Sequence, residues 1–213
     1  MNKIILAIQD GGTWMAPIIL AFGVALAIAS ERLVAIMKAK SNKTGVMKSV
    51  QQAIMSGNPN KAMQDLKPVA GKQALPAVLL AGLNAANRSD KEVESAMEQA
   101  TLEQFPKLTK RMAFLPMLAN VATLSGLLGT IVGLIEAFDA VASAPPDKKQ
   151  QMLAAGIAKA MYTTAGGLVV AIPTLVINSI LTQVISGIMD EVDQGSAELL
   201  NRIRENKRSQ AAK

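Results

Sequence analysis

Three long stretches without a formal charge interrupt this chain, and they constrain its fold more than any other feature of the sequence. They are residues 11–30, 112–135 and 160–189, which hold 20, 24 and 30 residues in a chain of 213. An α-helix rises about 1.5 Å per residue, so ~20 apolar residues cross the hydrocarbon core of a membrane. One such stretch alone would suit a buried helix of a soluble protein. Three in so short a chain predict an all-α membrane protein with three transmembrane helices.

The composition of the chain argues against most classes of enzyme. Half of the residues are hydrophobic but only 3% are aromatic, so small and aliphatic side chains fill the spans, as where helices pack closely in lipid. The sequence contains no Cys and no His, which excludes thiolate or imidazole metal sites, Cys nucleophiles and the commonest general base. No Asp or Glu lies within the three uncharged stretches, so they contain no pair of carboxylates that could act in catalysis. We therefore expect no catalytic residue, no metal and no cofactor.

The distribution of Lys and Arg predicts how the spans are oriented. Residues 31–112 and the tail after residue 189 hold 18 of them, whereas the N-terminal arm and the connection between the second and third spans hold three. Because cytoplasmic loops carry the excess of positive charge, we place the N-terminus and that connection outside. The net charge of +6 then reflects the orientation of the spans in the membrane, and no nucleic-acid partner is expected. Lys3 and the apolar run after it are similar to a cleavable signal peptide, but Asp10 favours an uncleaved first span.

These signals divide the chain into seven segments. Ser89 and Glu92 form a capping-box pattern, which predicts a helix that begins at Asp90. This helix is expected to continue into the second span, with Pro106 and Pro116 as kinks. Another helix, from residue 156 to residue 205, would be on the order of 75 Å long. The predicted segments are an interfacial N-terminal segment at 1–12, a transmembrane helix at 13–30, a cytoplasmic helical region at 31–112, a transmembrane helix at 113–139, a periplasmic connection at 140–156, a transmembrane helix at 157–187 and a cytoplasmic tail at 188–213.

Small and polar side chains form a stripe along each of the last two spans. Asn120, Thr123 and Thr130 fall within about 80° on the second span, and Thr164 and Asn178 share one sector of the third. The hydroxyls can bond to carbonyls of their own helices, or hold neighbouring helices together at ~0.6 kcal/mol each. Alternatively, the paired stripes line a polar path for an ion or receive a partner helix. The glycines expected to let a neighbouring backbone approach are Gly126, Gly129, Gly133 and Gly167.

Two segments of these spans carry a family resemblance. LSGLLGTIVG at 124–133 and GIAKAMYTTAGGLVVAIP at 156–173 resemble the signature spans of the MotA/TolQ/ExbB proton-channel family. Three spans and a large loop after the first resemble its ExbB and TolQ branch. The resemblance implies a multi-pass protein of the bacterial inner membrane that forms a homopentamer in contact with membrane lipid. It also implies a partner, a dimer of an ExbD- or TolR-like single-span protein whose membrane Asp exchanges the ion, H⁺ or Na⁺.

The resemblance further implies a function and two pore residues. The chain would be the ion-channel subunit of a stator or motor that couples the ion motive force to work at the cell envelope, by TonB- or Tol-type biopolymer transport. Thr130 in GLLGT and Thr164 in TTAGGL match two pore threonines of the family, so their hydroxyls are expected to bond the partner carboxylate or a water beside it. Thr123, Asn120 and Asn178 are expected to extend this lining. A gliding-motility stator of the same family and a passive helical membrane scaffold are the alternatives.

One position departs from the family pattern. Relatives similar to ExbB and TolQ commonly read GIAEAL near the outer end of the third span, whereas this sequence has Lys159 in place of the Glu. The second span carries Glu136, six residues beyond Thr130, and Lys159 lies five residues before Thr164. On antiparallel helices these are similar depths, so Glu136 and Lys159 are expected to form a charge pair at the outer mouth. Alternatively, Lys159 extends to the outer interface and Glu136 lies at the helix end.

Overall fold

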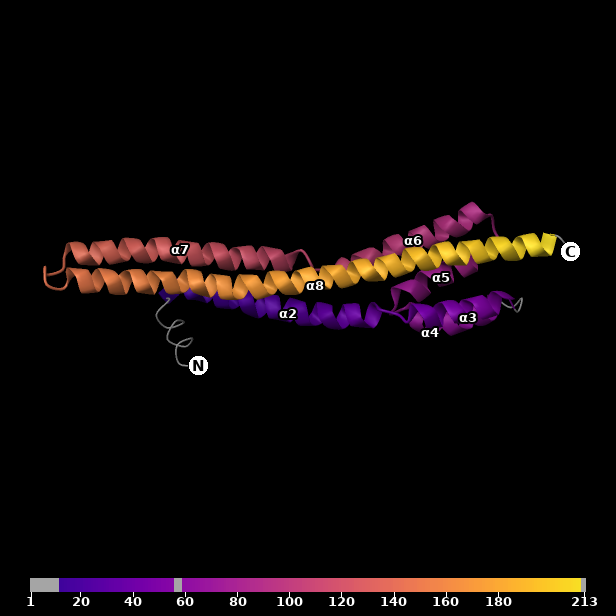
Figure 1. Cartoon of the computed structure of the whole chain (residues 1–213), viewed down its shortest axis with the longest axis horizontal. Coiled ribbons are helices and arrows are strands. Elements are labelled where there is room, and N and C mark those ends of the chain that lie inside the picture. Colours follow the sequence, from indigo (N-terminus) through magenta and orange to yellow (C-terminus); the bar gives the residue numbers. More distant parts are fainter. Residues whose placement is uncertain (1–11, 56–58, 212–213) are drawn as a thin grey trace. The chain divides into compact units, whose positions relative to one another are not determined.

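A computed structural model describes residues 12–55 and 59–211, and all regular structure in these residues is helical. The predicted all-α fold is thereby confirmed, while the interfacial segment predicted at 1–12 lies almost wholly outside the described residues. Figure 1 shows the helices in chain order. They are η1 (Gly12–Trp14), α2 (Met15–Ala39), α3 (Lys43–Met55), α4 (Pro59–Ala70), α5 (Ala74–Asn84), α6 (Asp90–Thr109), α7 (Phe114–Ala142) and α8 (Lys149–Ala211).

Among the described residues, three helical segments are long and apolar enough to cross a membrane. They contain α2, α7 and α8, and in each the most apolar window is less than a third buried within the protein. Large aliphatic side chains such as Leu20, Leu124 and Val169 are more than 60% exposed. Apolar surface on this scale is typical of helices that face lipid or other membrane helices. The chain is therefore a multi-pass membrane protein.

The chain divides into two compact units, and the first contains the apolar parts of the three spanning helices. This unit comprises residues up to Glu31 together with Arg111–Ile180, and in it the beginning of α2 lies beside α7 and the first half of α8 (Figure 1). A small core joins the three helices. It consists of Met15, Ile18, Ala21, Ala122 and Val170, with Leu118 packed against it.

The second unit contains the helices between the first two spans and the later part of α8. It comprises Arg32–Lys110 and Leu181–Lys213. Helix α5 is its most buried element, and Gly82 on α5 allows close packing against two neighbours. A Cβ at this position would lie 2.7 Å from the Met97 sulfur on α6 and 2.9 Å from Leu199 Cδ2 on α8. The polar chain between the first two spans thus folds as a helical unit with its own core.

The start of α6 was predicted correctly, but its continuation into the second span was not. Ser89 and Glu92 form the expected capping box, with the Glu92 N–H donating to Ser89 Oγ at 3.3 Å and the Ser89 N–H donating to Glu92 Oε2 at 3.1 Å. Helix α6 ends at Thr109 and α7 begins at Phe114. Arg111, between them, has a φ of 63°, in the left-handed region that interrupts an α-helix.

The two prolines of this region do not terminate a helix. Pro106 lies inside α6, and Pro116 lies in the first turn of α7, where a missing N–H costs no helical hydrogen bond. At the other end, α7 extends to Ala142 and α8 begins at Lys149, so both helices run into the connection predicted at 140–156. Helix α8 continues without interruption through the long helical stretch predicted from residue 156 to residue 205.

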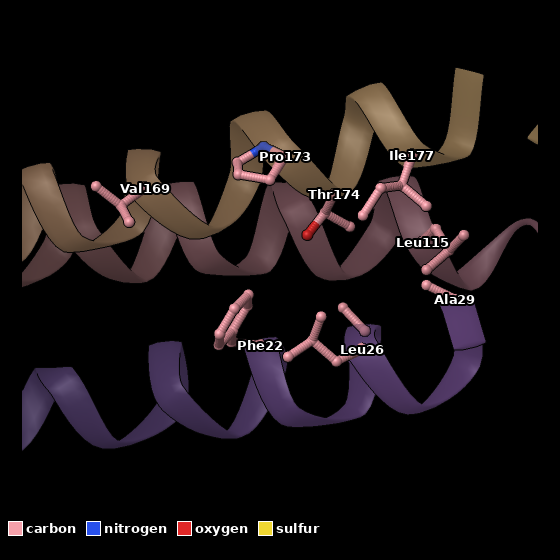
Figure 2. Close-up of a pocket in the computed structure, with 9 residues that line it drawn as sticks. Phe22, Leu26, Ala29, Leu115, Val169, Pro173, Thr174 and Ile177 are labelled. Atoms are coloured by element: carbon pink, nitrogen blue, oxygen red, sulfur yellow. The ribbon is translucent and has the colours of Figure 1, made fainter. Parts of the chain in front are cut away.

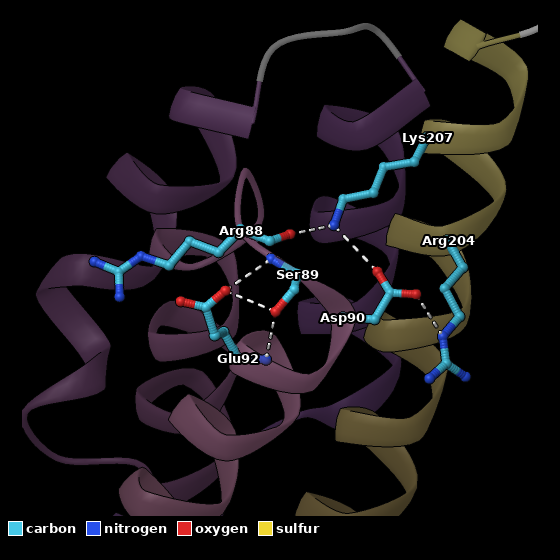
Figure 3. A network of polar contacts seen from close by, with 6 residues as sticks. All are labelled: Arg88, Ser89, Asp90, Glu92, Arg204 and Lys207. Carbon is cyan, nitrogen blue, oxygen red and sulfur yellow. Dashed lines mark hydrogen bonds and ion pairs between the residues drawn. The ribbon is translucent and has the colours of Figure 1, made fainter.

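A network of charges joins the start of α6 to the end of α8 in the second unit (Figure 3). Asp90 accepts hydrogen bonds from Lys207 Nζ at 3.1 Å and from Arg204 Nε at 3.0 Å, and Lys207 also donates to the carbonyl of Arg88. The hydrogen bond from Lys207, followed by that from Arg204, holds the pKa of Asp90 below its ordinary value. The Ser89 hydroxyl and N–H likewise lower the pKa of Glu92.

We expect Asp90→Asn to weaken the dependence of folding stability on acid. A carboxylate with a lowered pKa stabilises the folded state above the unfolded pKa of about 4, and this contribution is lost as the pH falls through the folded pKa. Thermal unfolding by circular dichroism at neutral pH and at about pH 3 should show a smaller difference for Asp90→Asn than for the wild type.

The control for this experiment is Asp65→Asn. Asp65 on α4 is exposed, and within the described part of the chain its side chain makes no hydrogen bond or ion pair. Its substitution should leave the difference between the two pH values unchanged. Equal behaviour of the two variants would show that the contacts of Asp90 with Arg204 and Lys207 do not contribute to stability.

Candidate functional site

Three threonine hydroxyls meet between α7 and α8, and we call Thr130, Thr163 and Thr164 the threonine cluster. The hydroxyls of Thr130 and Thr164 are directly hydrogen-bonded to each other, and Thr130 Oγ1 lies 3.5 Å from Thr163 Oγ1. Thr130 comes from the second predicted span, and the other two are consecutive residues of the third. The structure therefore brings together the two threonines that the family resemblance singled out, and adds a third.

The threonine cluster surrounds two backbone carbonyls that serve as shared acceptors. The carbonyl of Gly126 accepts from Thr130 at 3.2 Å, from Thr163 at 3.1 Å and from Thr164 at 3.1 Å. The carbonyl of Ala160 accepts from Thr163 at 2.7 Å and from Thr130 at 3.2 Å. Each hydroxyl has one proton and two lone pairs, so these contacts cannot all be made at once. The cluster therefore retains lone pairs that can accept a proton or a water hydrogen.

The hydroxyls differ in how far they are enclosed by the protomer. Thr163 is 2% exposed, whereas Thr130 and Thr164 are half-buried and so reach a surface of the protomer. Glycine at position 126 permits the close approach of the two helices, because a Cβ there would lie 2.8 Å from the carbonyl oxygen of Thr163. The absence of a side chain thus positions the hydroxyls of α8 against the backbone of α7.

A cavity of about 320 Å³ lies next to the threonine cluster, and we call it the charged cavity. Glu136 on α7 and Lys159 on α8 both line it, together with Trp14 of η1 and Thr163 of the cluster. Within the described residues no ion pair at 4.0 Å or less joins Glu136 to Lys159. Glu136 and Lys159 thus line the same cavity without a direct ion pair in this protomer, and their role as a charge pair at the outer mouth stays a prediction. The remaining lining residues are Thr13, Gly129, Val132, Gly133, Ala137, Ala140, Met152, Gly156 and Ala160.

The other polar residues predicted to line the ion pathway are placed apart from the threonine cluster. Thr123 donates to the carbonyl of Ala119, four residues earlier on its own helix, at 3.0 Å. Asn120 is exposed on α7, and Asn178 is half-buried on α8. The hydroxyl of Thr123 thus makes the local bond that is usual for a threonine within a helix.

The four glycines predicted to support helix packing all lie at close contacts between α7 and α8. A Cβ at Gly167 would lie 2.6 Å from the carbonyl oxygen of Ala122, and one at Gly133 would lie 3.0 Å from the Cβ of Ala160. A Cβ at Gly129 would lie 2.8 Å from Thr163 Oγ1. With Gly126, these positions keep the two helices close along the length that carries the threonine cluster.

A second cavity in this unit, of about 290 Å³, is almost entirely apolar (Figure 2). Side chains from α2, α7 and α8 point into it, among them Phe22, Leu115 and Ile177. Thr174 supplies a hydroxyl, but this hydroxyl donates to the carbonyl of Val170 on its own helix at 2.7 Å. This cavity offers no free polar group to an ion, so the charged cavity and the threonine cluster remain the candidate site.

Two features of the first unit go beyond the sequence prediction. Thr163 is part of the TTAGGL segment, but the family resemblance assigns a pore role to Thr164 alone; a pair of adjacent threonines in an apolar span is the signal that marks Thr163 as well. Glu31 and Arg111, 80 residues apart, form an ion pair at 2.6 Å at the boundary of the first unit. Such a pairing depends on which helices become neighbours, and spacing along the chain does not reveal it.

Comparison with known proteins identifies the family to which this chain belongs. A family profile described as the MotA/TolQ/ExbB proton channel family matches residues 70–194, which is more than half of the chain. The chain belongs to the MotA/TolQ/ExbB proton channel family. The match includes the whole of the threonine cluster and the charged cavity apart from residues of η1.

Relatives within this family come from the ExbB and TolQ branch. The biopolymer transport protein exbB1 of Vibrio cholerae is 29% identical over 168 residues, which are 78% of this chain and 74% of that protein. The Tol-Pal system protein TolQ of Haemophilus influenzae is 40% identical over 80 residues, or 38% of this chain and 35% of its own. The biopolymer transport protein ExbB of Pseudomonas putida is 30% identical over 120 residues, or 54% of this chain and 36% of its own. These matches confirm the resemblance to the ExbB and TolQ branch.

Proposed function

We propose that this chain is the proton-channel subunit of an inner-membrane energy-transducing complex that drives biopolymer transport of the ExbB or TolQ kind. The observation that carries the proposal is the direct contact of the Thr130 and Thr164 hydroxyls between two spanning helices. Family membership and relatives named as biopolymer transport and Tol-Pal system proteins support it. Neither the gliding-motility stator nor the passive scaffold is favoured by these relatives.

In the proposed assembly, five copies of the chain surround a dimer of an ExbD- or TolR-like single-span protein. Thr130 and Thr164 are half-buried in one protomer, which leaves them a surface toward a partner helix. The hydroxyls can donate to a partner carboxylate when it is ionised, and accept from it when it is protonated. The threonine pair can therefore hold the carboxylate in both of its protonation states as the proton passes. Asn120, Thr123 and Asn178 would extend the polar lining toward the cytoplasmic end, since α7 approaches Thr130 from that side and α8 continues from Thr164 toward it.

We place the outer mouth of the proton pathway at the charged cavity. The positive-inside rule predicts that residues 140–156 and the N-terminus are periplasmic. With this orientation, Glu136 near the end of α7 and Lys159 near the start of α8 would lie on the outer side. Ionisable residues at membrane depth are rare in spans that serve only as anchors, because their burial in lipid is costly. We propose that this pair takes the place of the single Glu common in relatives, and that it provides charge where protons approach.

Native mass spectrometry of the complex, extracted gently from its own membrane without overexpression, tests the proposed function. We expect five copies of this chain with two copies of a small single-span protein, because a channel of this kind needs a partner that carries the proton. Sequencing the small protein should then reveal an Asp within its span. A homo-oligomer that lacks any partner, found again in several detergents, would instead establish the scaffold.

A further inference from the structure

The charged cavity has a lining that is unusual for a membrane-spanning region. It carries one acidic and one basic side chain, Glu136 and Lys159, which are not in direct contact within the described protomer. Both residues are exposed in the protomer, and a charge at membrane depth is costly unless water or another polar group solvates it. A cavity of about 320 Å³ is large enough for several water molecules, each of which occupies about 30 Å³ in the liquid. These observations indicate a hydrated cavity.

Thr163 connects the charged cavity to the threonine pair. Thr163 lines the cavity although it is only 2% exposed, so it forms part of the cavity floor. Its hydroxyl lies 3.5 Å from the Thr130 hydroxyl, which in turn is bonded to Thr164. The same hydroxyl also shares both acceptor carbonyls with Thr130. Thr163 is therefore the residue that belongs both to the cavity lining and to the hydroxyl contacts of the site assigned above to proton transfer.

We propose that the charged cavity is a hydrated proton-access site within a single protomer, and that the Thr163 hydroxyl transfers protons from it to the Thr130–Thr164 pair. This inference rests on the proposed function and adds to it a route between α7 and α8, in addition to any path along the centre of the assembly. The ligand of the site is water carrying an excess proton. Glu136 is the group that exchanges protons with it, and Lys159 on α8 lines the same cavity.

The proposed transfer proceeds in balanced steps. The Glu136 carboxylate takes a proton from hydronium on the outer side, forming one O–H bond and leaving water. It then returns this proton to a water inside the cavity. That hydronium gives a proton to Thr163 Oγ1 while the proton already on this oxygen passes to Thr130 Oγ1. Thr130 releases its own proton in the same way toward Thr164 and the partner carboxylate, so every hydroxyl ends with the one proton it had at the start.

Proton flux through the complex tests the role of Thr163. The complex with its copurified partner is reconstituted into liposomes that contain a pH-sensitive dye, and a proton gradient is imposed. We expect Thr163→Val to lower the flux about tenfold, which corresponds to ~1.4 kcal/mol in the barrier. Thr163→Ser, which keeps the hydroxyl, should retain flux close to the wild type. Valine has nearly the shape of threonine, so assembly should persist in both variants.

The outcomes separate this inference from the proposed function. Normal flux in Thr163→Val, together with reduced flux in Thr130→Val, would overturn the access route and leave the channel function standing. Normal flux in both variants would overturn the access route and also the role proposed for the Thr130–Thr164 pair, because neither hydroxyl would be needed for conduction. Loss of flux in Thr163→Ser as well as in Thr163→Val would also overturn the relay, because the hydroxyl would not be what matters.

Hydration of the cavity can be measured separately, because the chain contains no native Cys. Val132→Cys places a thiol in the cavity lining, and Ile131→Cys places one at the adjacent position of α7, outside the lining. A membrane-impermeant thiol reagent added from the outer side should label Cys at 132 about tenfold faster, since a thiol in apolar surroundings ionises less readily. Equal labelling at both positions, or none at position 132, would show that the cavity is not a water-filled access site.

Discussion

Gly167→Leu should prevent α7 and α8 from packing and should abolish the folded complex. A Cβ at this position would lie 2.6 Å from the carbonyl oxygen of Ala122 and 3.4 Å from the Cα of Gly126. Both atoms belong to the backbone of α7, so no side-chain rotation can relieve the contact. Inserting atoms into packed interiors costs about 1–3 kcal/mol where side chains can move, and more where the backbone must move. We expect Gly167→Leu to lower the free energy of unfolding by about 3 kcal/mol or more.

Thermal unfolding in detergent and size-exclusion chromatography would measure this effect. The matched controls are Gly23→Leu on α2 and Gly187→Leu on α8, since a Cβ at either position has no neighbouring atom within 4 Å. Both controls add the same side chain to a helix and should unfold close to the wild type. If Gly167→Leu matched the controls and kept the oligomer, the close packing of α7 on α8 would not be required for assembly.

The same argument applies to another glycine of this interface, Gly129. At Gly129 the nearest atoms to an added Cβ belong to the side chains of Thr163 and Trp14, at 2.8 and 2.9 Å. Two of these atoms are the β-carbons of Thr163 and Trp14, both at 2.9 Å, and a β-carbon is fixed to its own backbone. Gly129→Leu should therefore also push α7 away from α8 and η1, although the carbonyl contact at Gly167 is the shorter one. We expect both variants to lose the packed oligomer, and Gly129→Leu to disturb the threonine cluster directly because Thr163 would have to move.

Much of this fold was predictable because its main signals are local or repeat along one helix. Three stretches of about 20 or more residues without charge in one short chain predict three spans, and each stretch is read from consecutive residues alone. The capping box at Ser89 and Glu92 depends on four consecutive residues and was found where it was predicted. Periodicity also placed Thr130 and Thr164 on polar faces, and the structure brings their hydroxyls into contact.

What escaped prediction depends on contacts between distant segments or on the conformation of a single residue. Nothing in the sequence marks Arg111 for the left-handed conformation that separates α6 from α7, because Arg rarely adopts it. The charged cavity exists only because η1, α7 and α8 meet around it, and its floor at Thr163 follows from the rotation of α8 against α7. A helical wheel gives the angle of a residue on its own helix but not the angle between two helices.

Thr130→Val and Thr164→Val should each remove most ion-coupled activity while the complex remains assembled. Valine keeps the volume of threonine but can neither donate nor accept a hydrogen bond. A hydroxyl bond between membrane helices contributes only ~0.6 kcal/mol on average, so the loss of stability should be small. The carboxylate of the proposed partner, in contrast, would lose a group that can bond to it in both of its protonation states. We expect proton flux to fall by at least about tenfold, equivalent to ~1.4 kcal/mol.

The control for both variants is Thr174→Val. Thr174 is a buried threonine of α8 whose hydroxyl bonds only to its own helix, so flux should be unchanged. Thr130→Ser and Thr164→Ser should restore flux, because each returns the hydroxyl. The double variant Thr130→Val/Thr164→Val should lose little more than either single variant, since residues that act as one pair are not additive. Wild-type flux in both single variants would mean that the threonine contact only holds α7 against α8, as an ordinary hydroxyl bond between helices does.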